Sequence, residues 1–382
     1  MDQEEDSKQV IALCMIVKNE ASVIKRALNS VYRIVDKVYI CDTGSTDGTQ
    51  DIIKEFLSDK NIPCEIQDRK WVDFATNRNQ CFALAKGNCD YIMTLDADEI
   101  FTPYIDKFPD YKKAVSTLPK FTQPRVDVAT VFGAFVYYRI QFFKESCDWE
   151  WFYPCHEICM SKEPTTMQKL SNVCIIPTQE GDRAKDPKRF LRDALLFENF
   201  LIDNPKDSRV IYYLAQSYGD AGKPDKALEA IEGIFDSTTW NEEEWSSRFR
   251  KARWSQMCHP EALDFINYYL EAYNTRPSRV EPLFYLILYY KSKKMWNVAR
   301  LLGEEALKIS YPDDILFVEK NIYDWRLKSE LASVHYNLKN YEKALELSTE
   351  LLRTPSLPTV EATRLESNIK KYKDWKKEED SK

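Results

Sequence analysis

Three clusters of polar side chains in this sequence are of the types that carry out chemistry. The first is Asp42-Thr-Gly-Ser-Thr-Asp-Gly-Thr49, the second is Leu95-Asp-Ala-Asp-Glu99, and the third is the segment 149–157, which ends in His156-Glu157. Carboxylates that lie close together repel one another unless a cation or solvent screens them. Oxygen ligands of this kind suit hard divalent cations. The second cluster therefore indicates a divalent metal site.

Each cluster also has a purely structural interpretation. Asp47 or Thr49 would cap a helix that begins after the first cluster, although capping leaves Asp42 without a role. The second cluster would be an exposed acidic loop. His156 would be a buried histidine whose ring nitrogens are satisfied. The residues alone leave both interpretations of each cluster open.

Alternating strands and helices must position the first two clusters. The expected strands are residues 11–17, 37–41, 64–67 and 91–95, and the expected helices between them are residues 21–31, 49–57 and 73–85. This order predicts a parallel sheet with helices on both faces. Ligands bind such sheets at the carboxyl ends of the strands. Both acidic clusters directly follow an expected strand, so we expect the function to lie there.

The pattern changes twice further along the chain. Aromatic and β-branched residues at 126–143 and 149–160 indicate either antiparallel strands or an excursion of strand and loop, and residues 172–177 predict one more strand. From about residue 187 the apolar residues recur with the 3.6-residue period of helices. Small residues recur there at intervals of 35, 37 and 45 residues, namely Ala227, Ala262, Ala299 and Ala344.

These intervals start near the ~34-residue period of tetratricopeptide repeats. We therefore predict about four stacked helix pairs closed by a charged helix at 361–377. The predicted domains are residues 1–185 and residues 186–382. A length of 382 residues with 44% hydrophobic side chains is enough for two domains, each with its own core.

Composition excludes several classes of protein. The net charge is −7 and no basic run stands out, which argues against broad nucleic-acid binding. The acidic start lacks the pattern of a signal peptide, and the longest nearly apolar run, 128–138, is too short for a transmembrane segment. Ten cysteines, mostly within apolar runs, indicate a reducing compartment. We therefore expect a cytoplasmic protein.

Four motifs in this order resemble the family 2 glycosyltransferases of the GT-A fold. They are residues 13–16 followed by Lys18-Asn-Glu20, residues 42–47, the segment Phe74-Ala-Thr-Asn-Arg-Asn79, and Asp96-Ala-Asp98. Segments 212–227, 276–282 and 316–331 resemble a subgroup, seen in bacteria and giant DNA viruses, in which tetratricopeptide repeats follow the transferase. For a viral member of this subgroup, the expected location is the host cytoplasm or the virion. The resemblance implies an α/β GT-A domain with a Rossmann-like mixed sheet, followed by an all-α solenoid.

The resemblance also implies an activity. It is that of an inverting, metal-dependent hexosyl- or N-acetylhexosaminyl-transferase, which moves a sugar from a nucleotide sugar, expected to be a UDP-sugar, to a hydroxyl of a glycan or protein. The residues expected at the nucleotide sugar are Val17, Glu20, Asp42, Arg78 and Asp96. The residues expected at Mn²⁺ or Mg²⁺ are Asp98, Asp96 and His156.

An inverting transfer needs one carboxylate to remove the proton of the attacking hydroxyl. Glu157 is the first candidate for this base, Asp148 and Glu150 are the alternatives, and Glu99 is also within reach of the sugar. The aromatic residues Trp149, Trp151 and Tyr153 form either a wall against a sugar face or part of an ordinary core. His259 and His335 are expected to be structural.

Other functions are compatible with parts of the sequence. One is a non-enzymatic scaffold that binds partners through the helical repeats and carries a relic transferase domain. Another is a nucleotidyltransferase, although the glycine-rich phosphate loop of such enzymes is missing from residues 15–20. The solenoid itself would present a protein acceptor, mediate dimerisation, or act only as a buttress.

Overall fold

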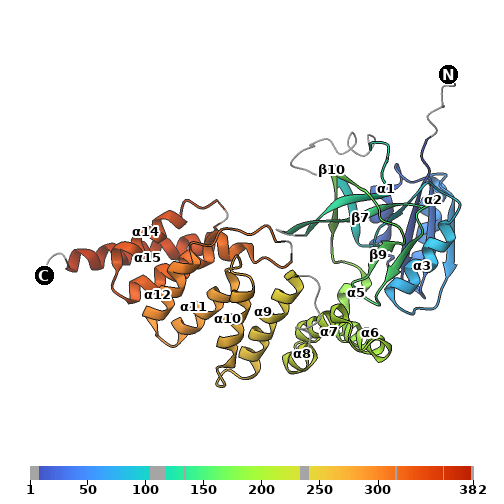
Figure 1. Ribbon diagram of the computed structural model, residues 1–382. Helices are drawn as coiled ribbons and strands as arrows, with labels where there is room; N and C mark the ends of the chain where they lie inside the picture. The colour runs from blue at the N-terminus through green and yellow to red at the C-terminus, as the bar shows by residue number, and fades with distance from the viewer. Residues whose placement is uncertain are drawn as a thin grey trace. The chain divides into compact units, whose positions relative to one another are not determined.

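A computed structural model describes residues 8–103, 118–132, 135–232, 241–314, 316–355 and 357–379. The chain divides into two compact units, Met1–Pro205 and Lys206–Lys382. The first unit combines a sheet with helices and the second is helical (Figure 1). The predicted order, an α/β domain followed by an all-α domain, is confirmed.

Alternating strands and helices open the first unit. They are β1 (Ile11–Val17), α1 (Ile24–Val31), β2 (Lys37–Asp42), α2 (Thr49–Asp59), β3 (Cys64–Asp68), α3 (Phe74–Ala85) and β4 (Tyr91–Thr94). In the sheet, β1 lies parallel to both β2 and β4, and β2 lies parallel to β3. The carboxyl ends of β1, β2 and β4 therefore meet at one edge of the sheet.

The apolar runs form strands because both faces of the sheet are covered. On β1, Leu13 and Met15 join a core that includes Ile24 of α1 and Ile53 of α2. The alternate residues face the opposite side, where Cys14 joins a second core with residues of α3. An uninterrupted apolar sequence is what a strand buried on both faces requires.

The rest of the sheet is mixed. It contains β5 (Glu99–Pro103), β6 (Arg125–Phe132), β7 (Phe135–Lys144) and β10 (Met167–Pro177), in the overall strand order β3-β2-β1-β4-β7-β6-β10-β5. The hairpin of β6 and β7 is antiparallel, and β7 runs antiparallel to β4. β8 (Trp149–Phe152) and β9 (Ile158–Ser161) pair as a separate two-stranded ribbon.

β5 was missing from the predicted strands. Its sequence, Glu-Ile-Phe-Thr-Pro, begins with a charged residue that continues the acidic cluster, so it has no clear strand signal. It forms a strand because β10 pairs with it along its full length. Glu99 is consequently fixed on a strand at the edge of the site.

The first unit ends later than the predicted boundary at residues 185/186. It includes α5 (Asp182–Lys185) and α6 (Arg189–Asp203). Arg183 donates two hydrogen bonds of 2.6 Å to the carboxylate of Asp193 on α6. Phe197, also on α6, is fully buried. The helical period at this point is real, but these tertiary contacts assign α6 to the sheet domain.

The second unit consists of helix pairs. They are α7 (Ser208–Asp220) with α8 (Pro224–Ile231), α9 (Asn241–Cys258) with α10 (Asp264–Thr275), α11 (Glu281–Ser292) with α12 (Trp296–Ala306), and α13 (Leu327–Asn337) with α14 (Tyr341–Leu351). Each pair also contacts the next pair, and α15 (Thr359–Glu379) packs on α14. This is the arrangement of a helical-repeat solenoid.

Three of the four recurring alanines lie in the second helix of a pair, where Ala227, Ala299 and Ala344 are fully buried. The position assigned to Ala262 is wrong, because that residue is exposed in the turn before α10. The interval to Ala262 matched the repeat period by coincidence. In α10 a small buried residue is found at Ala272 instead.

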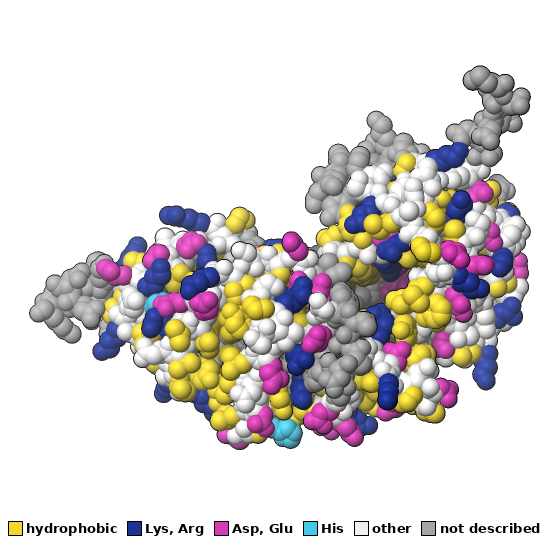
Figure 2. All heavy atoms as spheres, in the orientation of Figure 1, with side chains coloured by type: hydrophobic (Ala, Val, Ile, Leu, Met, Phe, Trp, Pro, Cys, Tyr) yellow, Lys and Arg dark blue, Asp and Glu magenta, His cyan; other side chains and the backbone are white. Residues whose placement is uncertain are grey.

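The surface agrees with the mixed charge of the sequence. On the face shown in Figure 2, basic and acidic side chains are interspersed over each unit. Within the described residues, no helix has the length and apolar character needed to cross a membrane.

Candidate active site

The loops that follow β1 and β2 are joined by side-chain hydrogen bonds. The backbone N–H of Asn19 donates to Ser45 Oγ (3.0 Å), and that of Glu20 donates to Thr49 Oγ1 (2.8 Å). Asp47 accepts from the N–H of Ala21 (3.0 Å) and from the N–H of Thr49 (3.1 Å). Asp47 and Thr49 therefore fix one loop against the other. The expected capping of α2 by either residue is wrong, because the N-cap of that helix is Gly48 and no side chain caps it.

Asp42 differs from these loop residues. It is the last residue of β2 and is fully buried. Its Oδ1 accepts hydrogen bonds from the N–H groups of Gly44 (2.8 Å) and Ser45 (2.7 Å). Its Oδ2 has no hydrogen-bond partner among the described residues. A buried carboxylate oxygen without a partner is costly, so this atom is suited to accept a hydrogen bond from a ligand.

Val17 lies beside Asp42 at the end of β1. Its carbonyl accepts from the N–H of Thr43 (2.9 Å) and from Thr43 Oγ1 (3.1 Å). Val17 is buried and pairs with Asp42 across the two strands. The structure thus places Val17 opposite Asp42 where the two strands end.

Glu20 and Asp98 come together around Gly181. The N–H of Gly181 donates to Asp98 Oδ2 at 3.4 Å, and the N–H of Asp182 donates to Glu20 Oε1 at 3.3 Å. A Cβ atom on Gly181 would lie 3.2 Å from the Glu20 carboxylate oxygens and 3.3 Å from Asp98 Cγ. The absence of a side chain at position 181 is therefore what lets both carboxylates approach this turn.

This arrangement leaves the two carboxylates poorly neutralised. Burial, with the nearby charges of Asp98 and Asp182, raises the pKa of Glu20 to about 7. Burial and the charge of Asp96 raise the pKa of Asp98 above its ordinary value. Neither carboxylate forms an ion pair with a Lys or Arg side chain in the described part of the chain. A cation supplied from outside would relieve this repulsion.

The other two residues expected at the metal are held differently. Asp96 accepts from Arg78 at 2.8 Å. His156, in the loop between β8 and β9, has a left-handed backbone (φ 51°) and stacks on the ring of Phe197 with 6.3 Å between ring centroids. Among the described residues, no group of three or more His, Cys, Asp or Glu side chains is arranged around a metal position. The predicted roles of Asp96 and His156 as metal ligands therefore stay predictions.

Arg78 of α3 connects the second cluster to the third. Its Nη2 donates to Asp96 Oδ1 (2.8 Å) and its Nε donates to Glu157 Oε1 (2.6 Å). Its guanidinium also lies 5.2 Å from the centre of the Trp151 ring. Enclosure by protein would raise the pKa of Asp96, but the charges of Arg78 and Arg139 outweigh that effect and lower it.

Arg139 of β7 makes the corresponding pair with Glu99. Its Nη2 donates to Glu99 Oε2 at 2.5 Å, and the backbone N–H of Asp96 donates to the same oxygen at 3.0 Å. Burial raises the pKa of Glu99, and the charge of Arg139 only partly offsets this. Sequence reasoning missed Arg139. The available signal was a charged residue inside the mostly apolar and aromatic run 135–143, where a partner is required.

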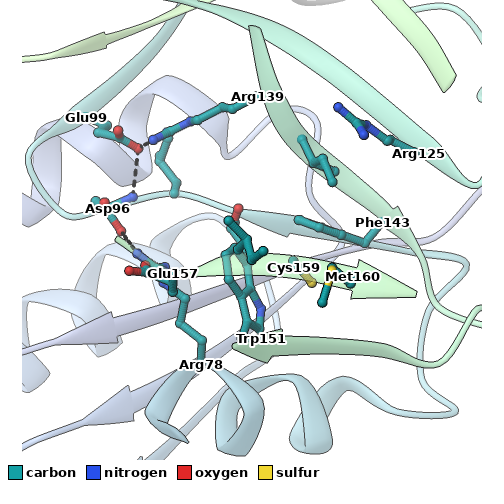
Figure 3. Close-up of a pocket in the computed structure, with 14 residues that line it drawn as sticks. Arg78, Asp96, Glu99, Arg125, Arg139, Phe143, Trp151, Glu157, Cys159 and Met160 are labelled. Carbon is teal, nitrogen blue, oxygen red and sulfur yellow. Dashed lines mark hydrogen bonds and ion pairs between the residues drawn. The ribbon is translucent and has the colours of Figure 1, made fainter. Parts of the chain in front are cut away.

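A pocket of about 440 Å³ opens beside these ion pairs. Its charged lining residues are Arg78, Asp96, Glu99, Arg125, Arg139 and Glu157. Its other lining residues are Thr94, Leu95, Ile140, Phe143, Trp151, Ile158, Cys159 and Met160. Figure 3 shows Arg78 reaching toward Asp96 and Glu157, and Arg139 reaching toward Glu99, around the ring of Trp151. The volume is in the ~300–1,000 Å³ range of small-molecule sites.

The remaining candidates for the catalytic base lie elsewhere. Asp148, in the turn after β7, is exposed and pairs with Lys86 at 3.5 Å. Glu150 is exposed on β8. Neither belongs to the pocket lining, whereas Glu157 and Glu99 both do.

Of the three aromatic candidates, only Trp151 lines this pocket. Trp149 packs on Phe143 at a centroid distance of 5.2 Å, and Tyr153 lies 5.9 Å from the ring of Phe200 on α6. Trp149 and Tyr153 are therefore packing residues in the described structure.

Comparison with known proteins agrees with this geometry. Residues 12–147 match the family model described as glycosyl transferase family 2. An uncharacterised glycosyltransferase of Rickettsia bellii is 37% identical over 89 residues, which is 23% of this chain and 28% of that protein. The glycosyltransferase SunS of Bacillus phage SPbeta is 35% identical over 100 residues, which is 26% of this chain and 22% of that protein.

A repeat protein is also among the relatives. A TPR repeat-containing protein of Synechococcus elongatus is 41% identical over 90 residues, covering 23% of this chain and 20% of that protein. A solved structure of the C-terminal part of a TPR repeat-containing protein from Cytophaga hutchinsonii covers 44% of this chain and 61% of that one, with 16% identity and a TM-score of 0.37. The matches span only 20 to 28% of the length of the three sequence relatives. Residues 12–147 thus match the family 2 glycosyltransferases, and stacked helix pairs follow this domain along the chain.

Proposed function

We propose that this protein is an inverting, metal-dependent glycosyltransferase. It moves a hexosyl or N-acetylhexosaminyl group from a nucleotide sugar, a UDP-sugar, to a hydroxyl of a glycan or protein. The observation that carries the proposal is the convergence of three features at one edge of the sheet. These features are the unpartnered oxygen of Asp42, the pair Glu20 and Asp98, and the pocket lined by Asp96.

Asp42 is the residue that we propose to bind the base of the nucleotide. A uracil ring carries an N–H donor, and the free Oδ2 of Asp42 is a short acceptor fixed at the end of β2. The loops after β1 and β2 hold each other through their own hydrogen bonds, so this acceptor is preorganised. Preorganisation lowers the entropic cost of binding.

Glu20 and Asp98 fit a divalent cation. Mg²⁺ is commonly bound through one or two protein carboxylates together with substrate phosphates rather than by a complete protein cage. Two carboxylates without a cationic partner match that pattern, and the diphosphate of the donor would complete it. When bound, such an ion neutralises the charge that develops on the leaving diphosphate.

The transfer forms one bond and breaks one bond at the anomeric carbon. The acceptor oxygen attacks that carbon as the bond to the diphosphate oxygen breaks, and the acceptor proton passes to a carboxylate. Glu157 remains the first candidate for this base and Glu99 the second, because both line the pocket. Arg78 and Arg139 orient these two carboxylates through the hydrogen bonds described above.

The helical repeats suggest a partner for the reaction. Stacked helix pairs present extended surfaces that bind polypeptides. We propose that the second unit binds a protein acceptor or a second copy of the chain, and that the reaction takes place in the cytoplasm. Deleting residues 206–382 should then reduce transfer to a protein acceptor, while donor hydrolysis by residues 1–205 continues if that unit folds by itself.

The decisive experiment measures release of nucleoside diphosphate from UDP-sugars, with and without Mn²⁺. The wild type is compared with Asp98→Asn and with the control Asp59→Asn, an exposed residue at the end of α2. We expect metal-dependent release by the wild type and the control, and a loss of about 100-fold or more in Asp98→Asn. If no nucleotide sugar is turned over or bound, the enzyme proposal fails and the scaffold alternative gains.

A further inference from the structure

The charged groups of the pocket have an unusual balance. Arg78 is shared between Asp96 and Glu157, and Arg139 is paired with Glu99. The third guanidinium of the lining, Arg125, belongs to β6. It donates from Nε and Nη2 to the two oxygens of Asp127, each at 2.7 Å. Every arginine of the described lining therefore already has a carboxylate partner.

The number of positive and negative groups in the pocket lining leads to the same conclusion. Three guanidiniums face three lining carboxylates, and the buried Asp127 adds a fourth carboxylate behind Arg125. No lysine or histidine is among the described lining residues. A further negative charge in this pocket would have no free cation to pair with. Enclosing an unpaired charge is strongly unfavourable.

The remaining lining suits an uncharged sugar ring. Trp151 offers an aromatic surface, and Ile140 and Phe143 extend the apolar wall. The carboxylates and guanidiniums stand around this wall as donors and acceptors for hydroxyl groups. A few convergent polar groups on an apolar wall are typical of small-molecule sites.

The position of the pocket identifies which ring it would hold. Asp96 lines the pocket and Asp98, two residues later, faces Glu20 at the proposed diphosphate position. In a nucleotide sugar the ring is attached directly to the diphosphate. The ring therefore has to lie next to Asp98, close in the chain to the pocket residues Asp96 and Glu99.

We infer that this pocket holds the transferred sugar and that it selects uncharged sugars against acidic ones. This inference rests on the proposed function. It adds a substrate class: neutral hexoses or N-acetylhexosamines are donors, whereas uronic acids are rejected. The selection arises because the carboxylates Glu99 and Glu157 occupy the guanidiniums that an acidic sugar would need.

The test compares donors that differ only in one carboxylate. Binding of UDP, UDP-glucose and UDP-glucuronic acid is measured by calorimetry in the presence of Mn²⁺, and the pair GDP-mannose and GDP-mannuronic acid covers the other nucleobase. In whichever pair carries the nucleobase that the protein binds, we expect the uncharged sugar nucleotide to bind at least about tenfold more tightly than its acidic counterpart.

A charge change in the pocket sharpens the test. Glu99→Gln keeps an oxygen for the N–H of Asp96 but frees Arg139. We expect the ratio of affinities for the neutral and the acidic sugar to fall by at least about tenfold in this variant. The variant should also bind the acidic sugar more tightly than the wild type does. Glu157→Gln, which frees one side of Arg78, is an independent second variant with the same expected direction. Glu150→Gln, on exposed β8, is the matched control and should keep the wild-type preference.

The outcomes separate the two proposals. Equal binding of UDP, the neutral sugar and the acidic sugar would overturn the inference about the pocket and leave the glycosyltransferase proposal standing. An unchanged preference in both folded Gln variants would also overturn it, because the ring would then lie elsewhere. If neither UDP nor GDP nor any of these donors binds, the proposed function itself fails.

Discussion

Two buried arginines, one in each unit, have nearly the same surroundings. Arg78 lies between Asp96 and Glu157 and against the ring of Trp151. Arg279, in the second unit, lies between Glu281 and Asp314, and its guanidinium is 3.6 Å from the centre of the Trp245 ring. Each arginine thus has two carboxylates and one indole.

The two arginines differ in what lies on the side of the guanidinium that neither the carboxylates nor the indole cover. Arg279 is completely buried, and it also donates to the carbonyls of Leu316 and Phe317, each at 3.1 Å. Arg78 instead faces the pocket of the transferase domain. A closed network of this kind can only stabilise a fold, whereas the same network beside a cavity can also orient a ligand. The pairing alone does not tell the two roles apart.

The largest effect on stability is expected for Arg279→Met. The substitution leaves Glu281 and Asp314 buried without their cation, and breaking a buried pair in this way costs about 3–5 kcal/mol. Amide hydrogen exchange in α11 should accelerate accordingly. The control is Arg300→Met, which removes a more exposed pair with Glu304 worth about 0.3–0.5 kcal/mol. Equal effects of the two variants would show that the network around Arg279 is not stabilising.

Arg78→Met is expected to affect function more than stability. Water can enter the pocket and solvate Asp96 and Glu157, so the free energy of unfolding should fall by about 3 kcal/mol, the low end of the range for buried pairs. The rate of sugar transfer should fall by about 10²–10³, because both carboxylates lose their orientation. Arg78→Lys should recover stability better than activity, since an ammonium group cannot make both hydrogen bonds in a fixed fork. If the two variants lose activity equally little, Arg78 is merely structural.

Glu20→Gln should change stability in the opposite direction to the two arginine variants. The pKa of Glu20 is raised to about 7, so the folded protein binds a proton more tightly than the unfolded chain does, and stability falls as the pH rises from about 4.5 through about 7. The variant lacks this loss. Its melting temperature relative to the wild type should therefore increase between pH 5 and pH 8, and its stabilisation by Mn²⁺ with UDP should disappear. If the difference in melting temperature between variant and wild type stays constant across this pH range, the pKa of Glu20 is not raised by its contact with Asp98, and the prediction is wrong.

The smallest effect is expected at His335, in the core of the repeat unit. Its ring is buried, neither ring nitrogen has a hydrogen-bond partner among the described residues, and burial lowers its pKa below 6.5. The folded state therefore binds a proton less readily than the unfolded chain, and stability is lost as the pH falls below 6.5. His335→Leu should remove this pH dependence, with a shift in melting temperature of no more than about 2–4 °C. An unchanged pH dependence in the variant would assign the effect to another group.

Much of the fold followed from the sequence because it depends on local patterns. The apolar runs of β1, β2 and β4 reflect burial of each strand on both faces of the sheet. The 3.6-residue period of the repeats reflects burial of each helix along one stripe. β5 and the domain boundary did not follow. β5 exists because β10 pairs with it, and α6 belongs to the first unit because Arg183 and Phe197 pack there.

The candidate site was predictable to the same extent. Asp42, Asp96 and Asp98 could be named as candidates because Asp42 ends a parallel strand and Asp96 and Asp98 follow another, at the edge of the sheet where ligands of such folds bind. Arg139 could not, because its partner Glu99 is 40 residues away and the contact depends on how β7 packs beside β4. Asp148 and Glu150 show the converse, since they are close to Glu157 in sequence but are exposed and do not line the pocket.

The sequence by itself determined which residue types stand at the ends of which strands, and with them the resemblance of residues 12–147 to family 2 glycosyltransferases and the order of the two units. Only the tertiary structure decided which of the acidic side chains are neutralised. Asp96, Glu99 and Glu157 receive guanidinium partners from α3 and β7, whereas Glu20 and Asp98 meet across Gly181 with no such partner among the residues that the structure describes. The physical reason is that charge compensation acts over a few ångströms in space, and its partners are set by packing rather than by separation along the chain.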